Sequence, residues 1–370
     1  MNGRDRDERE LAGWLRLTET PGVGREAARR LLAAFGSPEA VLAASTEDRR
    51  QVVSAAAAVA LARPGAHDDS LLATTLAWLN ADDRHQLLCL GEPDFPAHLL
   101  ETADPPLLLY ASGRLELLHR PSLAVVGSRH ATVQGRENAR SFAEQLGRAG
   151  LTIVSGLALG IDGAAHEGAL DTPGGTIAVV GTGLDQAYPR RHAALAQRIA
   201  TQGLLVSEYS LGTPPLRENF PQRNRIIAGL TRGTLVVEAT LQSGSLITAR
   251  LAAEAGRDVF AMPGSIHSPQ AKGCHALIKQ GAKLVETVQD VLDELGLPPW
   301  PPAPDVAVPE GEAAPNPLLD AMGYDPITLD ELVSRTGWSA AELNARLLDL
   351  ELAGRIERLP GQRFQRLARG

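Results

Sequence analysis

The chain has 370 residues, of which 44% are hydrophobic and 22% are charged, and its formal net charge is −8. This composition is typical of a globular protein and excludes a largely disordered chain or a coiled coil. Apolar stretches such as 55–62 are far shorter than the roughly 20 residues of a membrane span. The charged start, MNGRDRDERE, and the presence of only two cysteines lead us to expect a cytoplasmic protein without a secretory signal or a disulfide framework.

Charge is unevenly distributed along the chain. Residues 121–290 contain 16 Lys and Arg against 13 Asp and Glu, a net charge of +3, whereas the remainder contains 20 against 31, a net charge of −11. Only the middle segment therefore has a positive balance. This excess is small, but it permits a basic groove for a negatively charged partner.

Residues 1–85 are predicted to form a small helical domain, because they are rich in Ala, Leu and Arg. Within them, the turn Thr20–Gly24 is followed by the helical pattern REAARRLLAAF, which is how a helix-hairpin-helix begins. Glycines in such a turn allow backbone N–H groups to approach a DNA phosphate. A tight turn between packed helices is the alternative, and for this motif alone we favour it.

The middle domain, residues 86–296 with a core at 121–290, is predicted to be an α/β domain. A connector rich in Pro and Leu comes first, and its apolar run Leu107–Tyr110 is predicted as an edge strand. Beyond it, short β-branched runs alternate with amphipathic stretches, which indicates βαβ units and a mostly parallel sheet. The expected strands are Leu123–Val126, Thr152–Val154, Thr176–Val180, Leu204–Val206, Leu235–Val237, Val259–Ala261 and Leu284–Val285. The expected helices include Ala131–Ala149, His192–Thr201 and Leu246–Ala255.

The C-terminal part is predicted to contain a linker and a small domain. Residues 297–317 are rich in proline and indicate an extended linker. Residues 318–370 then show a helix ending at Gly337, a second helix capped by Ser339, and two basic segments around Pro360 and Gly361 that are typical of a hairpin. Helix, turn, helix and hairpin resemble a winged helix, which binds DNA in many proteins and serves as a protein-contact module in others.

Small-residue turns follow several of the predicted strands. Such turns expose backbone N–H groups at the start of the next helix, where an anion is stabilised. The first strand leads into Gly127, Ser128 and Arg129, and a guanidinium group can hold a phosphate through two hydrogen bonds. A later strand leads into a second candidate anion cradle, formed by Ser243, Gly244 and Ser245.

The segment FPQRNR, residues 220–225, is the most informative stretch of the chain. Arg223 and Arg225, with Arg217 just upstream, form a positive cluster beside the aromatic Phe220. Single-stranded nucleic acid is bound by this combination, because cations follow its backbone and a ring stacks on a base. A core phenylalanine with solvated arginines is the alternative interpretation.

Other candidate sites in the middle domain are weaker. Asp162 and His166 lie four residues apart and would share a helix face, but no nucleophile stands beside them. We therefore favour a capping Asp and a hydrogen-bonded core His over an acid–base pair. Cys274 and His275 are adjacent and have no second pair at ligand spacing, so we expect neither a metal nor a cofactor.

The order of these motifs resembles that of the DNA-processing protein A family, also called Smf. The resemblance covers about Glu92 to Val291 and rests on GSR, SGLALGID, GTGLD, FPQRNRIIAGL, SGSLITA and KGCHALIKQGA, of which FPQRNRIIAGL and SGSLITA are highly specific. The flanking segments fit a family that carries a helical N-terminal domain of the sterile-alpha-motif type and, in many members, a C-terminal winged helix.

The resemblance implies a non-enzymatic protein with a Rossmann-like central domain that dimerises. It would bind single-stranded DNA, shield it from nucleases and load the RecA recombinase onto it during natural transformation. One departure is that the family commonly has Asn at the position of His275. The DNA-binding residues expected on this basis are Gly127, Ser128, Arg129, Arg217, Phe220, Arg223, Asn224, Arg225, Ser243, Gly244, Ser245 and Lys272.

Two other functions remain alternatives at this point. Nucleotide phosphoribohydrolases of the lysine-decarboxylase-like type use a related Rossmann scaffold, but they resemble PGGxGTxxE where this chain has VEATLQSGS. A transcription regulator led by the winged helix would prefer duplex DNA, and its binding would require residues 318–370.

Overall fold

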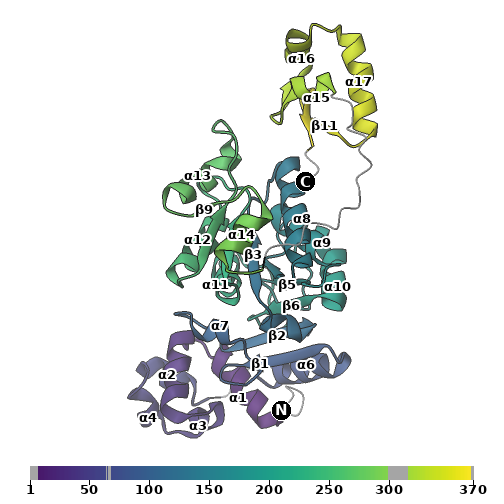
Figure 1. Cartoon of the computed structure of the whole chain (residues 1–370). Coiled ribbons are helices and arrows are strands. Elements are labelled where there is room, and N and C mark those ends of the chain that lie inside the picture. The colour runs from purple at the N-terminus through teal and green to yellow at the C-terminus, as the bar shows by residue number, and fades with distance from the viewer. Residues whose placement is uncertain (1–6, 64, 66–67, 299–315, 368–370) are drawn as a thin grey trace. The chain divides into compact units, whose positions relative to one another are not determined.

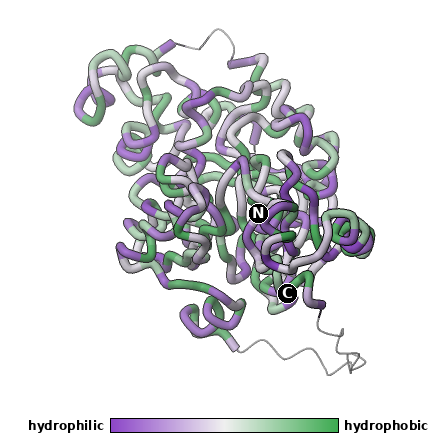
Figure 2. Tube along the Cα trace, turned by 90° about the horizontal axis from the view of Figure 1, so that it is seen from above, coloured by the Kyte–Doolittle hydropathy of each residue, from purple (hydrophilic) through white to green (hydrophobic). Residues whose placement is uncertain are grey.

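The structure is a computed structural model, and it describes residues 7–63, 65, 68–298 and 316–367. The chain divides into two compact units, Met1–Leu297 and Pro298–Gly370. Most of the predicted linker lies outside the described residues. Figure 2 shows polar and apolar positions interleaved along the trace, and none of the described helices combines the length and apolarity that a membrane crossing requires.

The first unit begins with a helical region. Serine caps start three of its helices: the hydroxyls of Ser37, Ser45 and Ser54 each accept a hydrogen bond from the backbone N–H three residues later. Its core is built from leucines such as Leu17 and Leu31, which are fully buried. The helices are α1 (Glu8–Glu19), α2 (Arg25–Phe35), α3 (Pro38–Ala43), α4 (Thr46–Arg50), α5 (Ala55–Ala60) and α6 (Asp68–Ala81).

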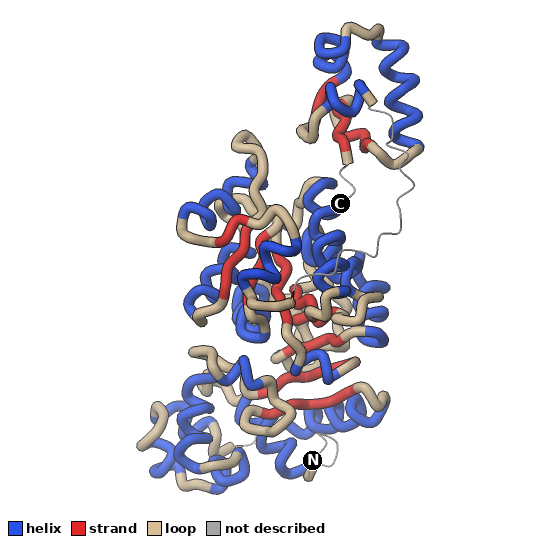
Figure 3. Tube along the Cα trace, in the orientation of Figure 1, coloured by secondary structure: helices blue, strands red, loops and turns tan. Residues whose placement is uncertain are grey.

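A nine-stranded sheet follows in the same unit, and its strands are drawn red in Figure 3. Seven of these strands are parallel. The strand order is β1-β2-β6-β5-β4-β3-β7-β8-β9. The mostly parallel sheet predicted from the alternating pattern is thus confirmed. The strands are β1 (His85–Cys89), β2 (Leu108–Gly113), β3 (Ser122–Val126), β4 (Thr152–Ser155), β5 (Thr176–Val179), β6 (Leu204–Ser207), β7 (Gly233–Val236), β8 (Asp258–Ala261) and β9 (Lys283–Leu284).

Helices cover both faces of the sheet (Figure 1), because the chain winds outward from β3 in both directions. Right-handed crossovers put the helices of the two halves on opposite faces. Accordingly, α8 packs on α9 and α11 packs on α12. The helices are α7 (Ala97–Leu100), α8 (Val133–Arg148), α9 (Ile161–Ala169), α10 (Ala193–Gln202), α11 (Asn219–Leu230), α12 (Ser245–Glu254), α13 (Lys272–Lys279) and α14 (Val288–Glu294), with short 3₁₀ turns at Leu115–His119, Arg190–His192 and Pro269–Ala271.

The expectation that Leu107–Tyr110 forms an edge strand is wrong in one respect. β2 is the second strand, and the edge is β1, an element that the sequence analysis did not predict. Both faces of β1 are covered: Leu87 belongs to the core of the helical region and Leu88 to the core of the sheet. Because β1 is buried on both sides, its sequence lacks the alternation that marks a half-exposed strand.

The second unit has the winged-helix arrangement that was predicted. Thr328 and Glu331 form a capping box at the start of α16, and Gly337 ends that helix with a φ of 71°. Ser339 caps α17 by accepting from the backbone N–H of Glu342. The elements are α15 (Pro317–Met322), β10 (Ile327–Thr328), α16 (Leu329–Thr336), α17 (Ala340–Leu352), β11 (Ile356–Leu359) and β12 (Arg363–Arg366), with sheet order β10-β12-β11.

Candidate nucleic-acid interface

The predicted anion cradles meet at the point where the sheet changes direction. From β3 the chain moves to β4 on one side, and later returns to place β7 on the other side. The loops after β3 and β7 leave the same edge of the sheet in opposite directions and leave a crevice between them. This crevice is where open α/β sheets bind ligands.

A cavity of about 380 Å³ fills this crevice. Its lining also includes His130, Gln270 and Thr240, to which the sequence analysis gave no role. Nine of the twelve residues predicted to bind DNA line it: Gly127, Ser128, Arg129, Phe220, Arg223, Asn224, Ser243, Gly244 and Ser245.

The turn after β3 is held by backbone contacts to its neighbours. Ser128 donates its N–H to the carbonyl of Glu238 after β7 (2.8 Å), and its own carbonyl accepts from the N–H of Ile161 (3.2 Å). A side chain at Gly127 would collide with both Ile161 and Glu238, so glycine is required by this close approach. The turn is thereby fixed, while the side chain of Arg129 remains exposed.

The carboxylate of Glu238 is directed away from the crevice. It accepts hydrogen bonds from the backbone N–H of Thr132 (2.9 Å) and from the Thr132 hydroxyl (2.5 Å), at the start of α8. Burial raises the pKa of this carboxyl group above its ordinary value. Glu238 therefore joins the end of β7 to α8 and brings no negative charge to the cavity lining.

Arg129 and Phe220 together form the mouth of the cavity. The guanidinium carbon of Arg129 lies 5.6 Å from the centroid of the Phe220 ring. The ring of Tyr188 also lies near Phe220, at a centroid distance of 5.3 Å and tilted by 37°. A second cavity, of about 190 Å³, is lined by Arg129, Phe220, Tyr188 and Arg223 among others. The two cavities share Arg129, Phe220 and Arg223 among their lining residues, and together they are called the trough below.

Tyr188 is a candidate residue that the sequence analysis missed. It lies in the segment YPRRH, and 42% of its surface is exposed although it is a large aromatic residue. Tyr188 is identified by its contact with Phe220, which lies 32 positions further along the chain. The signal available in the sequence was an aromatic residue just before the pair Arg190 and Arg191.

The far end of the trough is formed by the start of α12. Its N-cap residue, Gly244, provides no side-chain acceptor to the first turn. The hydroxyls of Ser243 and Ser245 lie 2.7 Å apart, and Asn224 donates to the Gly244 carbonyl (3.3 Å). The positive end of the helix dipole and the two hydroxyl groups thus face the cavity, as an anion cradle requires.

Arg223 is a buried support of the trough. Only 3% of its surface is exposed, and Nη1 donates to the carbonyl of Gly156 (2.7 Å) and to that of Val179, at the ends of β4 and β5. Burial lowers its pKa to about 10, so the group stays charged at neutral pH. Its Nε has no hydrogen-bond partner among the described residues, which leaves a donor beneath a site suited to anions.

His166 is a hydrogen-bonded core residue, as expected, but the expectation of a capping Asp is wrong. Gly160 is the N-cap of α9 without a side-chain hydrogen bond, and Asp162 instead binds the loop before the helix. Oδ2 of Asp162 accepts from the N–H groups of Gly156 (3.2 Å) and Ala158 (3.3 Å), and burial raises its pKa. His166 is fully buried; Nε2 accepts from the N–H of Leu157 (3.2 Å) and Nδ1 lies 2.7 Å from the Thr176 hydroxyl. Among the described residues that line the 380 Å³ cavity, Asp162 alone carries a carboxyl group.

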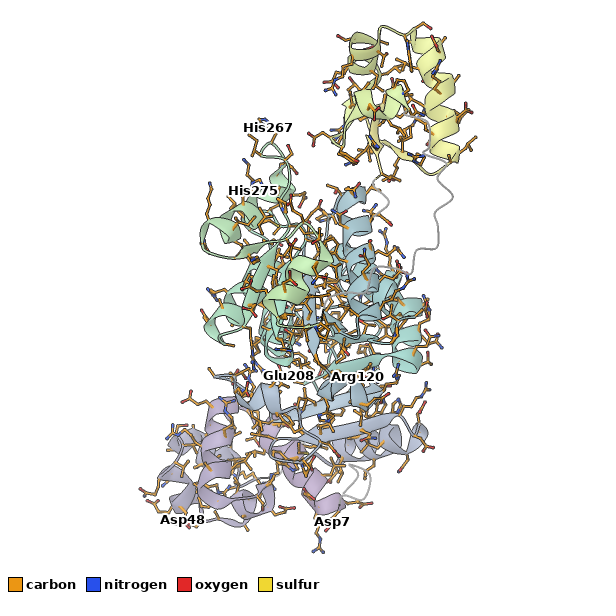
Figure 4. All side chains as sticks on the ribbon, viewed as in Figure 1. Asp7, Asp48, Arg120, Glu208, His267 and His275 are labelled. Carbon is orange, nitrogen blue, oxygen red and sulfur yellow. The ribbon has the colours of Figure 1, made fainter. Side chains whose placement is uncertain are left out.

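Arg225 belongs to a different part of the molecule from the trough. Its guanidinium group pairs with Glu208 and, at 3.1 Å, with Asp104. Asp104 also pairs with Arg25 (2.8 Å) and Arg29 (2.6 Å) in the first half of α2. Figure 4 labels Glu208 where the helical region meets the sheet. These contacts fit the interpretation of Thr20–Gly24, before α2, as a tight turn in a packed region rather than a DNA-binding turn.

Two further predicted residues lie outside the cavity lining. Arg217 is exposed just before α11. Lys272 is exposed at the first position of α13, and its ammonium group donates to the carbonyl of Ile266 (2.5 Å). His275, which stands where the family commonly has Asn, lies with Nε2 3.0 Å from the Gly264 carbonyl.

A larger cavity lies elsewhere in the unit. It measures about 740 Å³ and is bounded by α12, α13 and the strands β8 and β9. Three ion pairs involve its charged lining residues: Arg250 with Glu254 (3.5 Å), Lys283 with Glu294 (3.1 Å) and Arg257 with Glu101 (2.6 Å). It shares Ser243 with the predicted site, but neither Arg129 nor Phe220 belongs to its lining. Within the described ranges, no three His, Cys, Asp or Glu side chains are grouped as metal ligands would be.

The family described as DNA recombination-mediator protein A matches residues 86–296. The chain belongs to this family. The DprA winged helix domain matches residues 301–362. Protein Smf of Escherichia coli is 47% identical over 301 residues, which are 78% of this chain and 79% of that protein. The DNA processing protein DprA of Streptococcus pneumoniae is 52% identical over 200 residues, 54% of this chain and 71% of the relative.

Two solved structures of family members resemble this fold. The X-ray structure of DprA from Streptococcus pneumoniae has a TM-score of 0.67 at 38% identity and covers 78% of this chain and 98% of its own. The structure of DNA processing protein A from Helicobacter pylori has a TM-score of 0.52 at 32% identity and covers 57% of this chain and 95% of its own. The latter was described in terms of its single-stranded DNA binding mode.

Proposed function

We propose that this protein binds single-stranded DNA in the trough between the loops after β3 and β7. The observation that carries the proposal is Arg129 lying 5.6 Å from the ring of Phe220 at the mouth of the 380 Å³ cavity. An exposed cation attracts the phosphate backbone, and an aromatic face beside it stacks an unpaired base. The bases of a duplex are not free to stack in this way.

Two features of the trough and one relative support this proposal. Gly127 to Arg129 and Ser243 to Ser245 provide two anion cradles, which suits a polymer of phosphates better than one small phosphate. Tyr188 provides a second ring next to Phe220. The Helicobacter pylori relative binds single-stranded DNA according to its description.

The test is an anisotropy titration with a labelled oligothymidine and a duplex of the same length. Tighter binding of the single strand by the full chain, and a weaker affinity for Arg129→Ala, would support the proposal. Equal affinity for both forms, or an Arg129→Ala variant that matches the parent, would contradict it. Loss of duplex binding on deletion of 318–370, with no single-strand preference, would instead favour a winged-helix regulator.

The trough is proposed to bind without catalysis. Its one lining carboxylate, Asp162, is engaged with backbone N–H groups. A phosphoribohydrolase would need an acidic group free to act on a ribose. Incubation with nucleoside monophosphates should release no base, and release of a base would contradict this part of the proposal.

We further propose that the bound strand is protected and handed to the RecA recombinase during natural transformation. This role is supported by membership in the recombination-mediator family, and the protein would perform it in the cytoplasm. A single strand coated with single-strand-binding protein should become accessible to RecA when this protein is added. The readout is RecA-dependent ATP hydrolysis, and an unchanged rate would contradict the loading role. Unchanged nuclease digestion would contradict protection.

Homodimer formation is also proposed, through the edge of the sheet opposite the helical region. β9 is the last strand, and 40% of the surface of its Leu284 is exposed. An open strand edge with an exposed leucine is suited to pairing with a second copy. Sedimentation should show a dimer that Leu284→Arg converts to a monomer. A monomeric parent would contradict this arrangement.

A further inference from the structure

The winged-helix unit presents an unexpected surface on α17. This helix follows α16 in the helix-turn-helix and holds the position of the recognition helix, which in DNA-binding members of this fold enters the major groove. Its inner side is buried through Leu343, Leu347 and Leu350, which pack in the core of the unit. Its solvent side is therefore the part available to a partner.

The solvent side of α17 carries an apolar stripe. Ala341, Ala345, Leu348 and Leu352 are all exposed, at successive spacings of four, three and four residues. This is the spacing of the core positions in a coiled-coil seam. Leu348 is 52% exposed and Leu352 is 79% exposed, the highest value among the large hydrophobic residues that the structure describes. Two leucines left in water on one helix face indicate a contact surface.

The flanks of this stripe are acidic. The four positions beside the seam are Glu342, Asn344, Asp349 and Glu351. The one base on the helix, Arg346, bonds to Glu342 (2.9 Å) and lies over the Trp338 ring at 4.1 Å. A phosphate backbone approaching this face would meet three carboxylates and two leucines. The face is thus unsuited to duplex DNA.

We propose that the solvent face of α17 is a docking surface for an amphipathic helix of a partner protein, with leucine-type residues along its seam and basic residues on its flanks. The apolar seams would pack together and remove Leu348 and Leu352 from water. Lysines or arginines of the partner would lie against Glu342 and Asp349. Charge complementarity selects this partner and excludes an acidic one.

The same charges disfavour two other occupants. A second copy of α17 would bring acidic flanks against acidic flanks in either orientation, because the positions beside the seam hold no base. The Pro-rich segment 299–315 of this chain carries Asp305, Glu310 and Glu312 and no base. Its charge therefore repels the face, and its prolines do not suit a helix.

The test uses two synthetic helical peptides with identical leucine seams, one flanked by lysines and one by glutamates. Labelled peptide is titrated with the full chain, and anisotropy is measured. The lysine-flanked peptide should bind more tightly, and Leu348→Gln with Leu352→Gln should weaken it by about tenfold or more. The matched control is Leu100→Gln, which alters a leucine 49% exposed in the other unit and should leave binding unchanged.

Charge reversal provides the second arm. Glu342→Lys with Asp349→Lys should transfer the preference to the glutamate-flanked peptide.

Equal binding of both peptides by the parent, or no effect of the leucine substitutions, would overturn the proposal. The proposal would also be overturned if the parent sedimented as a larger species than the leucine variant, because a second copy would then occupy the face. A duplex-DNA affinity that falls with the leucine variant would also overturn it in favour of nucleic acid.

Discussion

Arg223 and Arg225 lie two positions apart on α11, and their guanidinium groups leave the helix on opposite sides. Arg223 reaches the carbonyl groups of Gly156 and Val179 beneath the trough. Arg225 reaches Glu208 and Asp104, where the helical region joins the sheet. Residues two apart on a helix do not share a face, so the positive cluster of the FPQRNR segment divides between support of the trough and domain packing.

Removing Arg225 is expected to destabilise the protein without changing the trough. Arg225→Ala leaves Glu208, whose side chain is 6% exposed, without its closest ion-pair partner, and such a loss costs about 3–5 kcal/mol. The free energy of unfolding from urea titration is the measurement. The double variant Glu208→Gln with Arg225→Gln should lose less of the free energy of unfolding than Arg225→Ala, because it buries no uncompensated charge. Single-strand affinity of the folded protein should match the parent, and a selective loss of affinity would return Arg225 to the DNA site.

Arg129→Ala is expected to weaken DNA binding while leaving stability unchanged. The side chain is exposed and its main described contact is the ring of Phe220. Losing one phosphate contact should reduce the slope of log affinity against log salt by about 1. Titrations of oligothymidine at several salt concentrations measure this slope. An unchanged slope would mean that Arg129 does not contact the phosphate backbone.

Phe220 is expected to stack a base. Phe220→Ala should cost about 1–3 kcal/mol of single-strand binding free energy. Phe220→Leu retains an apolar side chain but removes the ring, so it serves as the matched control and should recover little of the loss. Full recovery by leucine would show that the contribution is packing against Tyr188 rather than stacking.

His166 is expected to make stability depend on pH. Burial lowers its pKa from 6.5 to about 3, so between these values the unfolded chain binds a proton that the folded chain does not. The contribution of neutral His166 to the free energy of unfolding is fully present above pH 6.5. It is lost as pH falls toward 3, at up to about 1.4 kcal/mol per pH unit. Urea unfolding at pH 7 and pH 5 should show a loss of roughly 2 kcal/mol from this group. The His166→Gln variant should lose correspondingly less free energy of unfolding between pH 7 and pH 5.

His166 and His192 also explain how the loop beneath the trough is held. Leu157 has a φ of 58°, which is unusual for a residue with a branched side chain. Its N–H is bound by Nε2 of His166 (3.2 Å), and its carbonyl by Nδ1 of His192 (2.9 Å). Protonation of His166 would remove the acceptor, so acid should loosen this loop along with the fold.

Much of the fold could be predicted from the sequence, because local patterns determine it. All seven strands expected from Leu123–Val126 onward appear within one or two residues of their predicted bounds. β1 could not be predicted from alternation, since both its faces are buried. The winged helix was predictable from the capping residue Ser339 and from Gly337.

The candidate site was predictable in its loops and less so in its individual side chains. Turns at strand ends locate the cradles, because parallel strands end at one edge. Whether an arginine faces the crevice or the interior depends on tertiary contacts, and Arg223 and Arg225 show that composition alone does not settle it. Tyr188 was missed because its partner Phe220 is distant in sequence.

The most direct test of single-strand binding in the trough is photo-crosslinking. An oligothymidine with one 5-iododeoxyuridine is irradiated with the full chain, and the adduct is located by mass spectrometry. The account predicts adducts at Phe220 or Tyr188, which are lost in competition with unlabelled oligothymidine. Adducts confined to residues 316–367 or to the helices of 8–81 would contradict it.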